Sequence, residues 1–292
     1  MNVSTSDVFP QILYGIVIVA LVYVMYMGVE FLWRVYLSYA GTRISVYPYT
    51  GQRPVTFSQD ITSGQSNVTY LPVSQNQVTG IEFSYSTFLY VQDSTFPTTT
   101  GTPGWNTAFY KGYASGPFPL CGPGVFVGSD HENNPVLRVV MNSYGNWFNK
   151  VDVKQIPVNK WFHLTIVVSA NNTVYVYING NLANKMVLEG TIAYQNYQPL
   201  NLLPSYATPA AKKSDFDNSS GTSPLRGIPA GENFVILGPM AGYISNVVYY
   251  SYAIGYSEIV ASMQKGPSTA MDTQSMVTPP YLIDTWWTQQ KA

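Results

Sequence analysis

The chain has 292 residues, enough for one large β domain or two smaller ones with appendages. Only 10% of the residues are charged and the formal net charge is −1, without any run of basic residues, which argues against nucleic acid as a partner. The single cysteine, Cys121, excludes an internal disulfide framework, and two histidines with one thiol leave almost no ligands for a zinc site.

Aromatic residues make up 15% of the chain, and the chain has 24 tyrosines. Because tyrosine combines contact area with a polar tip, such a charge-poor, tyrosine-rich composition is typical of a protein packed against partners. Strand propensity in an all-β chain explains the same composition without any partner. The composition leaves both explanations open.

The first part of the chain predicts a membrane anchor. No charged residue occurs from Val8 to Val29, and the run IVIVALVYVMYMG dominates this stretch. About 20 apolar residues are enough to cross a bilayer core as a helix. We therefore expect a short N-terminal segment at 1–11 and a transmembrane helix at 12–33. A cleaved signal peptide is the alternative, although it would have a positively charged start and a shorter apolar core.

The residues that follow the apolar run indicate how the helix lies in the membrane. Trp33, Arg34 and Tyr36 are expected at the membrane interface, where amphipathic and basic side chains are favoured. Arg43 and Arg53 add to a basic excess on this side, so the positive-inside rule predicts a single-pass protein with the bulk of the chain on the cytosolic side. In that orientation the sequons would stay unused; they begin at Asn67, Asn171 and Asn218.

The remainder of the chain is dominated by strand signals. Residues 34–79 are expected to form a connector with the first strands, and strand-like runs continue to about residue 256. WFHLTIVVSANNTVYVYING at 161–180 alternates apolar and other residues around two turn sequences, which predicts hairpins of an antiparallel sheet. One further helix is expected after this region, with Ser257 as its N-cap and Gly266-Pro267 as its stop.

The order of these runs resembles the laminin-G-like, or concanavalin A-like, jelly-roll family. STFLYVQ, VLRVVMN, PVNKWFHLTIVV, VYVYING and the late GYISNVVYYSYAIGYSEI carry the resemblance, which covers residues 80–265. It implies an all-β fold, an antiparallel jelly-roll sandwich of two curved sheets. His163 lies where the resemblance implies packing or a backbone hydrogen bond.

Two segments depart from the family pattern. Residues 191–231 are expected to be an insertion, and a loop of that length is usually functional or disordered. Residues 266–292 are expected to form a C-terminal tail, in which Trp286 and Trp287 are adjacent. A tryptophan pair at an exposed terminus is costly unless it contacts something. The pair is therefore an interaction candidate, with the chain's own sandwich, another subunit or the membrane interface as its contact.

The sequence gives no support for catalysis. Glycoside hydrolases of this fold need two carboxylates flanking the sugar bond, and the resemblance implies a Glu-x-Asp-x-(x)-Glu strand motif for them. Glu132 follows Asp130 by two residues in the turn-like GSDHENNP, but no second Glu follows at the required spacing. Neighbouring Ser, His and Asp residues in that turn cannot adopt triad geometry. We expect a protein that is not an enzyme.

Many laminin-G-like domains bind calcium at the sandwich rim, and hard cations prefer oxygen ligands. The resemblance therefore makes Asp130, Glu132 and Asn133 the candidate calcium ligands, with a solvated polar turn as the alternative; no other cofactor is expected. Glycan binding would use exposed aromatic rings beside Asn or Asp, for which the candidates are Trp105, Tyr144 and Trp147.

Two hypotheses of function follow. An anchor, a cytosol-facing jelly roll, a long insertion and a Trp-ended tail together resemble the membrane-linked minor capsid proteins of large DNA viruses. In this hypothesis the chain is a structural protein between an inner membrane and a capsid, with the lipid bilayer and capsid subunits as partners. The alternative is a membrane-anchored, lectin-like surface protein that binds glycans.

Overall fold

The computed structural model describes residues 5–40, 43–62, 68–74, 81–96, 104–113, 120–130, 132–193, 197–208 and 234–272, with side chains of the first helix described for 13–32. The chain divides into two compact units, residues 1–43 and residues 44–292.

The first unit is one helix, α1 (Thr5–Ala40), of 36 residues. A straight helix of that length extends about 54 Å at 1.5 Å per residue. The apolar sequence favours a helix in lipid because a helix satisfies every backbone polar group within itself. The helix begins before the expected span at 12–33 and continues beyond it.

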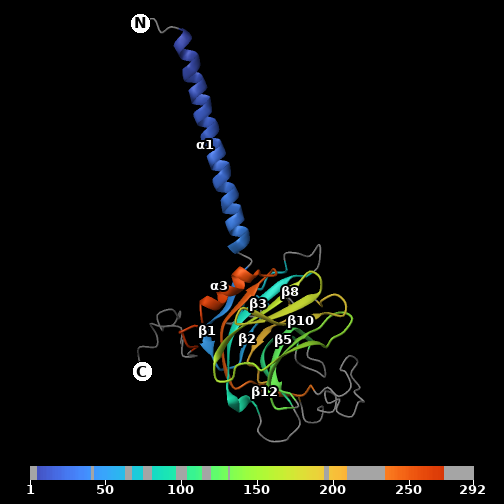
Figure 1. Ribbon diagram of the computed structural model, residues 1–292. Helices are drawn as coiled ribbons and strands as arrows, with labels where there is room; N and C mark the ends of the chain where they lie inside the picture. The colour runs from blue at the N-terminus through green and yellow to red at the C-terminus, as the bar shows by residue number, and fades with distance from the viewer. Residues whose placement is uncertain are drawn as a thin grey trace, which may run out of the picture. The chain divides into compact units, whose positions relative to one another are not determined.

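The second unit is a sandwich of two sheets (Figure 1). Every described pairing between its strands is antiparallel except that of β12 with β4, so the predicted all-β antiparallel sandwich is confirmed. The six-stranded sheet has the strand order β1-β13-β3-β8-β9-β10, and we name it sheet A. The seven-stranded sheet has the order β2-β11-β4-β5-β6-β7, with β12 beside β4, and we name it sheet B.

The strands of sheet A are β1 (Arg43–Gly51), β3 (Phe83–Val91), β8 (Trp161–Ser169), β9 (Thr173–Ile178), β10 (Asn181–Val187) and β13 (Gly242–Tyr250). Those of sheet B are β2 (Val55–Phe57), β4 (Trp105–Tyr113), β5 (Leu120–Ser129), β6 (Pro135–Met141), β7 (Asn149–Lys154), β11 (Leu200–Leu202) and β12 (Ile236–Pro239). A short 3-10 helix, η1 (Asp93–Thr95), follows β3.

The predicted hairpins at 161–180 are confirmed. β8 pairs with β9 from Leu164↔Ile178 to Ser169↔Thr173, and β9 pairs with β10. Asn172 closes the first turn with φ 57°, and Asn179-Gly180 closes the second with φ 49° and 77°. Asn and Gly adopt this left-handed region more readily than other residues, which is why these sequences mark the turns.

The main core lies between the two sheets. Alternate side chains of β3, β8 and β13 face those of β4, β5 and β6, and their apolar members are almost completely inaccessible. Tyr85 of sheet A and Phe109 of sheet B meet with ring centroids 6.1 Å apart. The other large buried side chains of this layer include Leu89, Phe162, Leu137 and Tyr249.

The outer face of sheet B is also buried. Trp105, Phe126 and Val140 point away from the main core and pack under Phe148 and Phe234, and the rest of this cluster is Tyr110, Cys121, Val136, Val235 and Ile236. The strands β5 and β6 are therefore apolar on both faces, which explains why GVFVGS and VLRVVM read as nearly continuous apolar runs.

The outer face of sheet A is covered in part by α3 (Tyr256–Gln264) (Figure 1). Ile259 packs with Val248, Tyr250, Ile254 and Val167 of the sheet side. The helix exists as predicted, but its predicted N-cap is wrong. Gly255 is the N-cap, and the carboxylate of Glu258 accepts a hydrogen bond from the Gly255 N–H at 3.0 Å. The reciprocal capping bond explains why the helix begins two residues earlier than Ser257 would allow.

Part of the expected insertion at 191–231 belongs to the sandwich. β11 pairs with both β2 and β4, so this short strand lies inside sheet B. Thr208 then bonds with Ile236 through two contacts, Thr208 N–H to the Ile236 carbonyl at 2.8 Å and Ile236 N–H to Thr208 Oγ1 at 3.0 Å. The chain thus leaves and re-enters the described fold at one place, and residues 209–233 lie outside the described residues.

Candidate functional site

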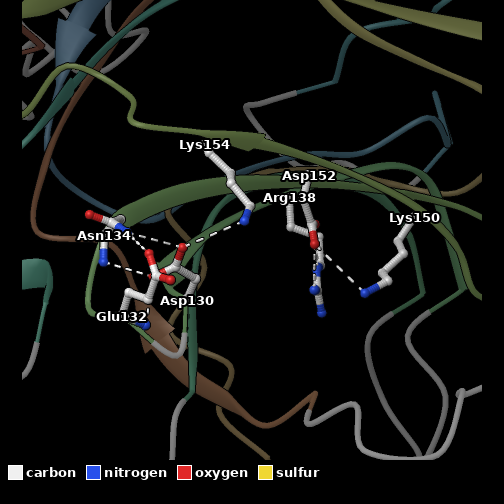
Figure 2. Close-up of polar contacts among 7 residues, drawn as sticks. All are labelled: Asp130, Glu132, Asn134, Arg138, Lys150, Asp152 and Lys154. Carbon is white, nitrogen blue, oxygen red and sulfur yellow. Dashed lines mark hydrogen bonds and ion pairs between the residues drawn. The ribbon is translucent and has the colours of Figure 1, made fainter.

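The candidate calcium ligands lie in the turn between β5 and β6, and Figure 2 draws two of them, Asp130 and Glu132, together with Asn134. Asp130 Oδ1 accepts hydrogen bonds from the backbone N–H groups of Glu132 and Asn134, each at 2.9 Å. The Asn134 amide also donates to Asp130 Oδ2 at 3.3 Å and to Glu132 Oε2 at 3.1 Å. Lys154 Nζ lies 3.9 Å from Asp130 Oδ2. These contacts lower the pKa of Asp130, the bond from Asn134 N–H being the largest cause.

The same turn has a structural explanation. Asn133 has φ 62°, a conformation that Asn tolerates, and the Asp130 carboxylate collects the N–H groups that the reversing backbone exposes. A calcium ion would have to replace those donors. Among the described residues, no three His, Cys, Asp or Glu side chains gather as a metal site. Calcium at Asp130, Glu132 and Asn133 stays a prediction.

A second charged cluster lies on β6 and β7 (Figure 2), with Arg138 buried and with Asp152 and Lys150 partly exposed. Arg138 donates to both carboxylate oxygens of Asp152 at 2.7 Å, and Lys150 Nζ lies 3.6 Å from the same carboxylate. The Arg138 guanidinium also lies 4.0 Å from the ring centroid of Trp105. Burial raises the pKa of Asp152, but the bonds and charge of Arg138 outweigh it, and the pKa is lowered overall. Arg138 and Asp152 face each other in the strand register, so the pair holds two strands together rather than presenting charge to a ligand.

The burial of Lys111 was not predicted from the sequence. Lys111 on β4 is 1% exposed, and its Nζ donates to the Gln198 carbonyl at 2.6 Å. Burial lowers the pKa of Lys111 to about 7. Nothing in FYKGY distinguishes this lysine from a surface one, because its burial depends on β11 lying against β4.

His163, on the outer face of β8, belongs to a buried polar chain under α3. Its Nε2 lies 2.8 Å from Ser86 Oγ, which in turn lies 2.8 Å from Ser262 Oγ of α3. Its Nδ1 has no hydrogen-bond partner among the described residues. Burial lowers the pKa of His163 to about 4. A serine beside a histidine is also a nucleophile arrangement, but all three side chains are buried and the Nδ1 side lacks an orienting carboxylate, so this chain joins α3 to the sheet.

Three aromatic rings form a row across the end of the outer face of sheet A. Tyr90 on β3 pairs in register with Trp161 on β8 and with Tyr243 on β13. Ring centroids are 5.6 Å apart for Tyr90 and Trp161 and 5.9 Å apart for Tyr90 and Tyr243. All three side chains are half-buried. Each had a strand signal of its own, but only the strand order places them side by side.

The aromatic residues considered for glycans do not form one surface. Trp105 is 5% exposed and belongs to the buried cluster over sheet B, while Tyr144 is 76% exposed. Trp147 is half-buried and packs against Phe148 with ring centroids 5.2 Å apart. No platform of adjacent exposed rings joins these three.

The described glutamates of the sandwich also have structural contacts. Glu82 accepts a hydrogen bond from the Ala170 N–H, Glu189 accepts one from Asn146, and Glu258 caps α3. Together with Glu132 in its turn, these are the described glutamates of the second unit. Glu132 lies in the same turn as Asp130, and both carboxylates accept hydrogen bonds from the Asn134 amide.

The apolar helix is long and apolar enough to cross a membrane over Leu13–Leu32, and none of this window is buried. A signal sequence near the N-terminus has the same properties. Trp33, Arg34 and Tyr36 lie in α1, but their side chains fall outside the described residues, as do Trp286 and Trp287 entirely. The interface and tail roles stay predictions.

Comparison with protein families decides the superfamily. Residues 63–218, more than half of the chain, match a laminin-G-type model described as "Concanavalin A-like lectin/glucanases superfamily". The chain belongs to this superfamily. The resemblance inferred from the order of strand motifs is thereby confirmed for the domain. A comparison with curated proteins finds no match.

Several solved structures match the chain at low sequence identity and low TM-score. The native heptameric SAP-like pentraxin from Limulus polyphemus matches with 12% identity and a TM-score of 0.42, over 78% of this chain and 84% of that one. Domain 4 of AbnA, a GH43 extracellular arabinanase from Geobacillus stearothermophilus, in complex with arabinotriose, matches with 17% identity and a TM-score of 0.35, over 66% and 69%. The binding domain of botulinum neurotoxin serotype D matches with 11% identity and a TM-score of 0.39, over 64% and 37%. The chain spans about two fifths of the length of the toxin-domain structures it matches.

Proposed function

We propose that this protein is a non-enzymatic, membrane-anchored interaction protein. The proposal depends on one observation: a 36-residue helix precedes a concanavalin A-like sandwich in the same chain. The central window of that helix is long and apolar enough to span a bilayer. The apolar window alone matches the length of a bilayer core. The remaining turns of the helix extend into the interface on one or both sides.

The sandwich supports a binding role rather than a catalytic one. Its described glutamates accept hydrogen bonds in turns and caps, and its Arg138–Asp152 pair is bidentate. The buried Ser86–His163 pair is inaccessible under α3. Folds of this kind host many functions, so the function has to be inferred from the residues of the site. The polar residues described above make contacts that stabilise the fold.

The specific role we propose is a minor capsid or scaffold component that links an internal membrane to a protein shell. The basic residues after the apolar run support an orientation with the sandwich on the cytosolic side, which in a virion lies between the inner membrane and the capsid. The partners would be the bilayer and capsid subunits. Residues 209–233, which start and end at one place on the sandwich, would supply contacts to the shell.

The first experiment is protease protection on sealed native membranes that carry the full-length chain with an epitope near Ala292. Digestion from the cytosolic side alone is expected. Intact mass, with resistance to alkaline extraction, distinguishes a retained anchor from a cleaved signal sequence. Loss of the N-terminal helix from the mature chain, or protection of the epitope, would contradict the tether.

The shell contact has its own test. Replacing residues 209–233 by a short Gly-Ser linker should abolish incorporation into the particle, while the Thr208–Ile236 contacts keep the sandwich folded. The matched control replaces the exposed Lys185 and Leu182 on β10 by serine. Equal incorporation of the linker variant and the control would refute this contact.

A lectin-like surface protein is the second candidate. The superfamily description includes lectins, and Asn171, the start of one sequon, is exposed in the turn between β8 and β9. This candidate requires the opposite topology. It predicts a glycan on Asn171 in a eukaryotic host, detected as a mass shift that Asn171→Gln removes, together with binding on a glycan array by the folded protein.

A further inference from the structure

The row formed by Tyr90, Trp161 and Tyr243 lies on the outer face of sheet A, outside the apolar cluster that α3 covers. The cluster under α3 comes from the opposite stretch of the same strands: Val248 and Tyr250 lie farther along β13 than Tyr243, and Val167 lies farther along β8 than Trp161. The row therefore continues a covered surface, yet its three rings remain half-exposed. Aromatic rings in such a position are suited to contact another aromatic or apolar group.

The chain that leaves α3 runs directly past this row. Gly266 accepts a hydrogen bond from the Asn246 side chain at 2.7 Å, and Ser268 N–H donates to Ser245 Oγ at 2.8 Å. Ser245 pairs with Phe88 in the next register position along the face from the Tyr243↔Tyr90 pair. Residues 266–268 are therefore one row away from the aromatic rings.

The described chain ends beside the same end of the sheet. Thr50 N–H donates to Ala270 O, and Asp272 N–H donates to Thr50 O, each at 2.8 Å. Thr50 Oγ1 lies 2.7 Å from Ser245 Oγ, so β1 and β13 are joined here. Tyr47 donates to Asp272 Oδ2 at 2.8 Å. With neighbouring strands about 4.8 Å apart, Asp272 starts the tail within roughly 15 Å of Tyr90.

The sequence beyond Asp272 supplies a matching group. Trp286 and Trp287 follow Asp272 by 14 and 15 residues, and a chain reaches at most about 3.5 Å per residue. That reach, about 50 Å, exceeds the distance to the row several-fold. A tethered group at this distance has an effective concentration in the millimolar range, so even a weak aromatic contact would be well populated.

We propose that residues 273–292 bind back onto the chain's own sandwich, with Trp286 and Trp287 packed on the row of Tyr90, Trp161 and Tyr243. The tail then extends over these three rings the cover that α3 and residues 266–272 begin. This contact is independent of whether the protein serves as a capsid component or as a lectin.

The test is proximity cross-linking in the full-length protein in lipid nanodiscs. Cys121 is fully buried and stays unlabelled under native conditions. One variant carries Lys160→Cys, exposed beside Trp161, together with Gln289→Cys in the tail. The matched control pairs Gln289→Cys with Lys185→Cys, which is exposed on the far edge strand β10. A short bis-maleimide should give about tenfold more intramolecular product for the Lys160 pair than for the control.

Changes in the tail then test the aromatic contact without touching the sandwich. Trp286→Ser with Trp287→Ser should reduce the Lys160 product to the control level, and Tyr281→Ser should leave it unchanged. Equal yields for the two cysteine pairs would overturn the proposal. So would cross-linked dimers whose yield falls on dilution, which assign the tail to a second copy, or quenching of the tail tryptophans by brominated lipids, which assigns them to the membrane.

Discussion

The two outer faces of the sandwich are covered in different ways. Over sheet B, an aromatic cluster that includes Phe148 and Phe234 lies beside a bidentate ion pair, in which Arg138 is buried under Trp105 and Asp152 is partly exposed. Over sheet A, a nine-residue helix covers a neutral polar chain at His163, and the aromatic row beside it stays partly exposed. One face thus holds a buried charge, while the other holds buried neutral polar groups.

The difference has a physical basis. Burying the Arg138 charge costs desolvation, which its aligned carboxylate partner offsets, so removing that partner leaves an uncompensated buried charge. A neutral His–Ser–Ser chain tolerates looser cover, because only hydrogen bonds are lost when water enters. The face that holds charge should therefore be the more sensitive to mutation, and the four predictions below test that order.

The largest effect is expected at Phe234, which lies between Phe126 and Phe148 with ring centroids 5.1 Å and 4.8 Å away. Phe234→Ala should lower the free energy of unfolding by about 4 kcal/mol, because it opens a cavity in a fully buried aromatic cluster. Chemical denaturation of the full chain in detergent measures this loss. Tyr144→Ala, at a 76% exposed position, is the control and should change stability by less than about 0.5 kcal/mol.

The second-largest effect is expected at the ion pair between Arg138 and Asp152. Asp152→Asn leaves the Arg138 charge under Trp105 without its counter-ion, which should cost about 3 kcal/mol. The pKa of Asp152 is lowered in the folded state, so its contribution is complete above its unfolded pKa of about 4 and is lost as the pH falls through the folded value. Comparing wild type and variant by denaturation at pH 7 and pH 3 measures both parts. If wild type and variant differ by the same free energy of unfolding at pH 7 and at pH 3, the ionisation of Asp152 does not contribute to the pH dependence of stability.

On the other face, protonation of His163 should destabilise the cover. The folded pKa of about 4 lies below the unfolded value of about 6.5, so the contribution of neutral His163 is complete above pH 6.5 and is lost as the pH falls toward 4. We expect the wild type to lose about 2 kcal/mol more between pH 7 and pH 5 than His163→Asn. The hydrogen-exchange protection factors of amides in α3, each taken relative to the intrinsic exchange rate at that pH, should fall over the same interval. Parallel pH profiles for the two proteins would disprove this linkage.

The smallest effect is expected at the start of α3. Glu258→Ala removes the bond to the Gly255 N–H and should cost about 1 kcal/mol. Glu258→Gln keeps an acceptor and should recover most of that loss. If both variants expose the aromatic cluster under α3 to the same degree, measured by tyrosine accessibility, the cap does not hold the helix on the sheet.

Much of the fold was predictable from local patterns. The alternation in WFHLTIVV and VYVYI, with Asn-Gly at the turn, specified the β8–β9 hairpin and its register, because a one-residue slip would turn the apolar side chains to the other face. Apolar runs in GVFVGS and VLRVVM indicated strands but not that both faces are buried. The insertion expected at 191–231 includes a strand of sheet B, which the sequence did not indicate. The segment LNL at 200–202 is too short to give a clear strand signal.

The candidate site was predictable only as a set of residue types. GSDHENNP indicated a polar turn with carboxylates, and the structure adds that Asp130 accepts the N–H groups of its own turn. The burial of Lys111 and Arg138 was not predictable, because each is covered by an element remote in sequence, whereas the packing of His163 was expected from the family resemblance. The superfamily was predicted from the family resemblance, which depends on the order of motifs along the chain.

The sequence by itself determined the apolar helix and the hairpins, because each depends on spacing between neighbouring residues, and the order of its motifs along the chain indicated the superfamily by resemblance. Only the tertiary structure decided which polar groups are buried and which rings share a surface. Tyr90, Trp161 and Tyr243 are separated by 71 and 82 residues in the chain, and they become neighbours because β13, β3 and β8 lie side by side in one sheet. Strand order is set by packing of the whole core, which no local pattern encodes.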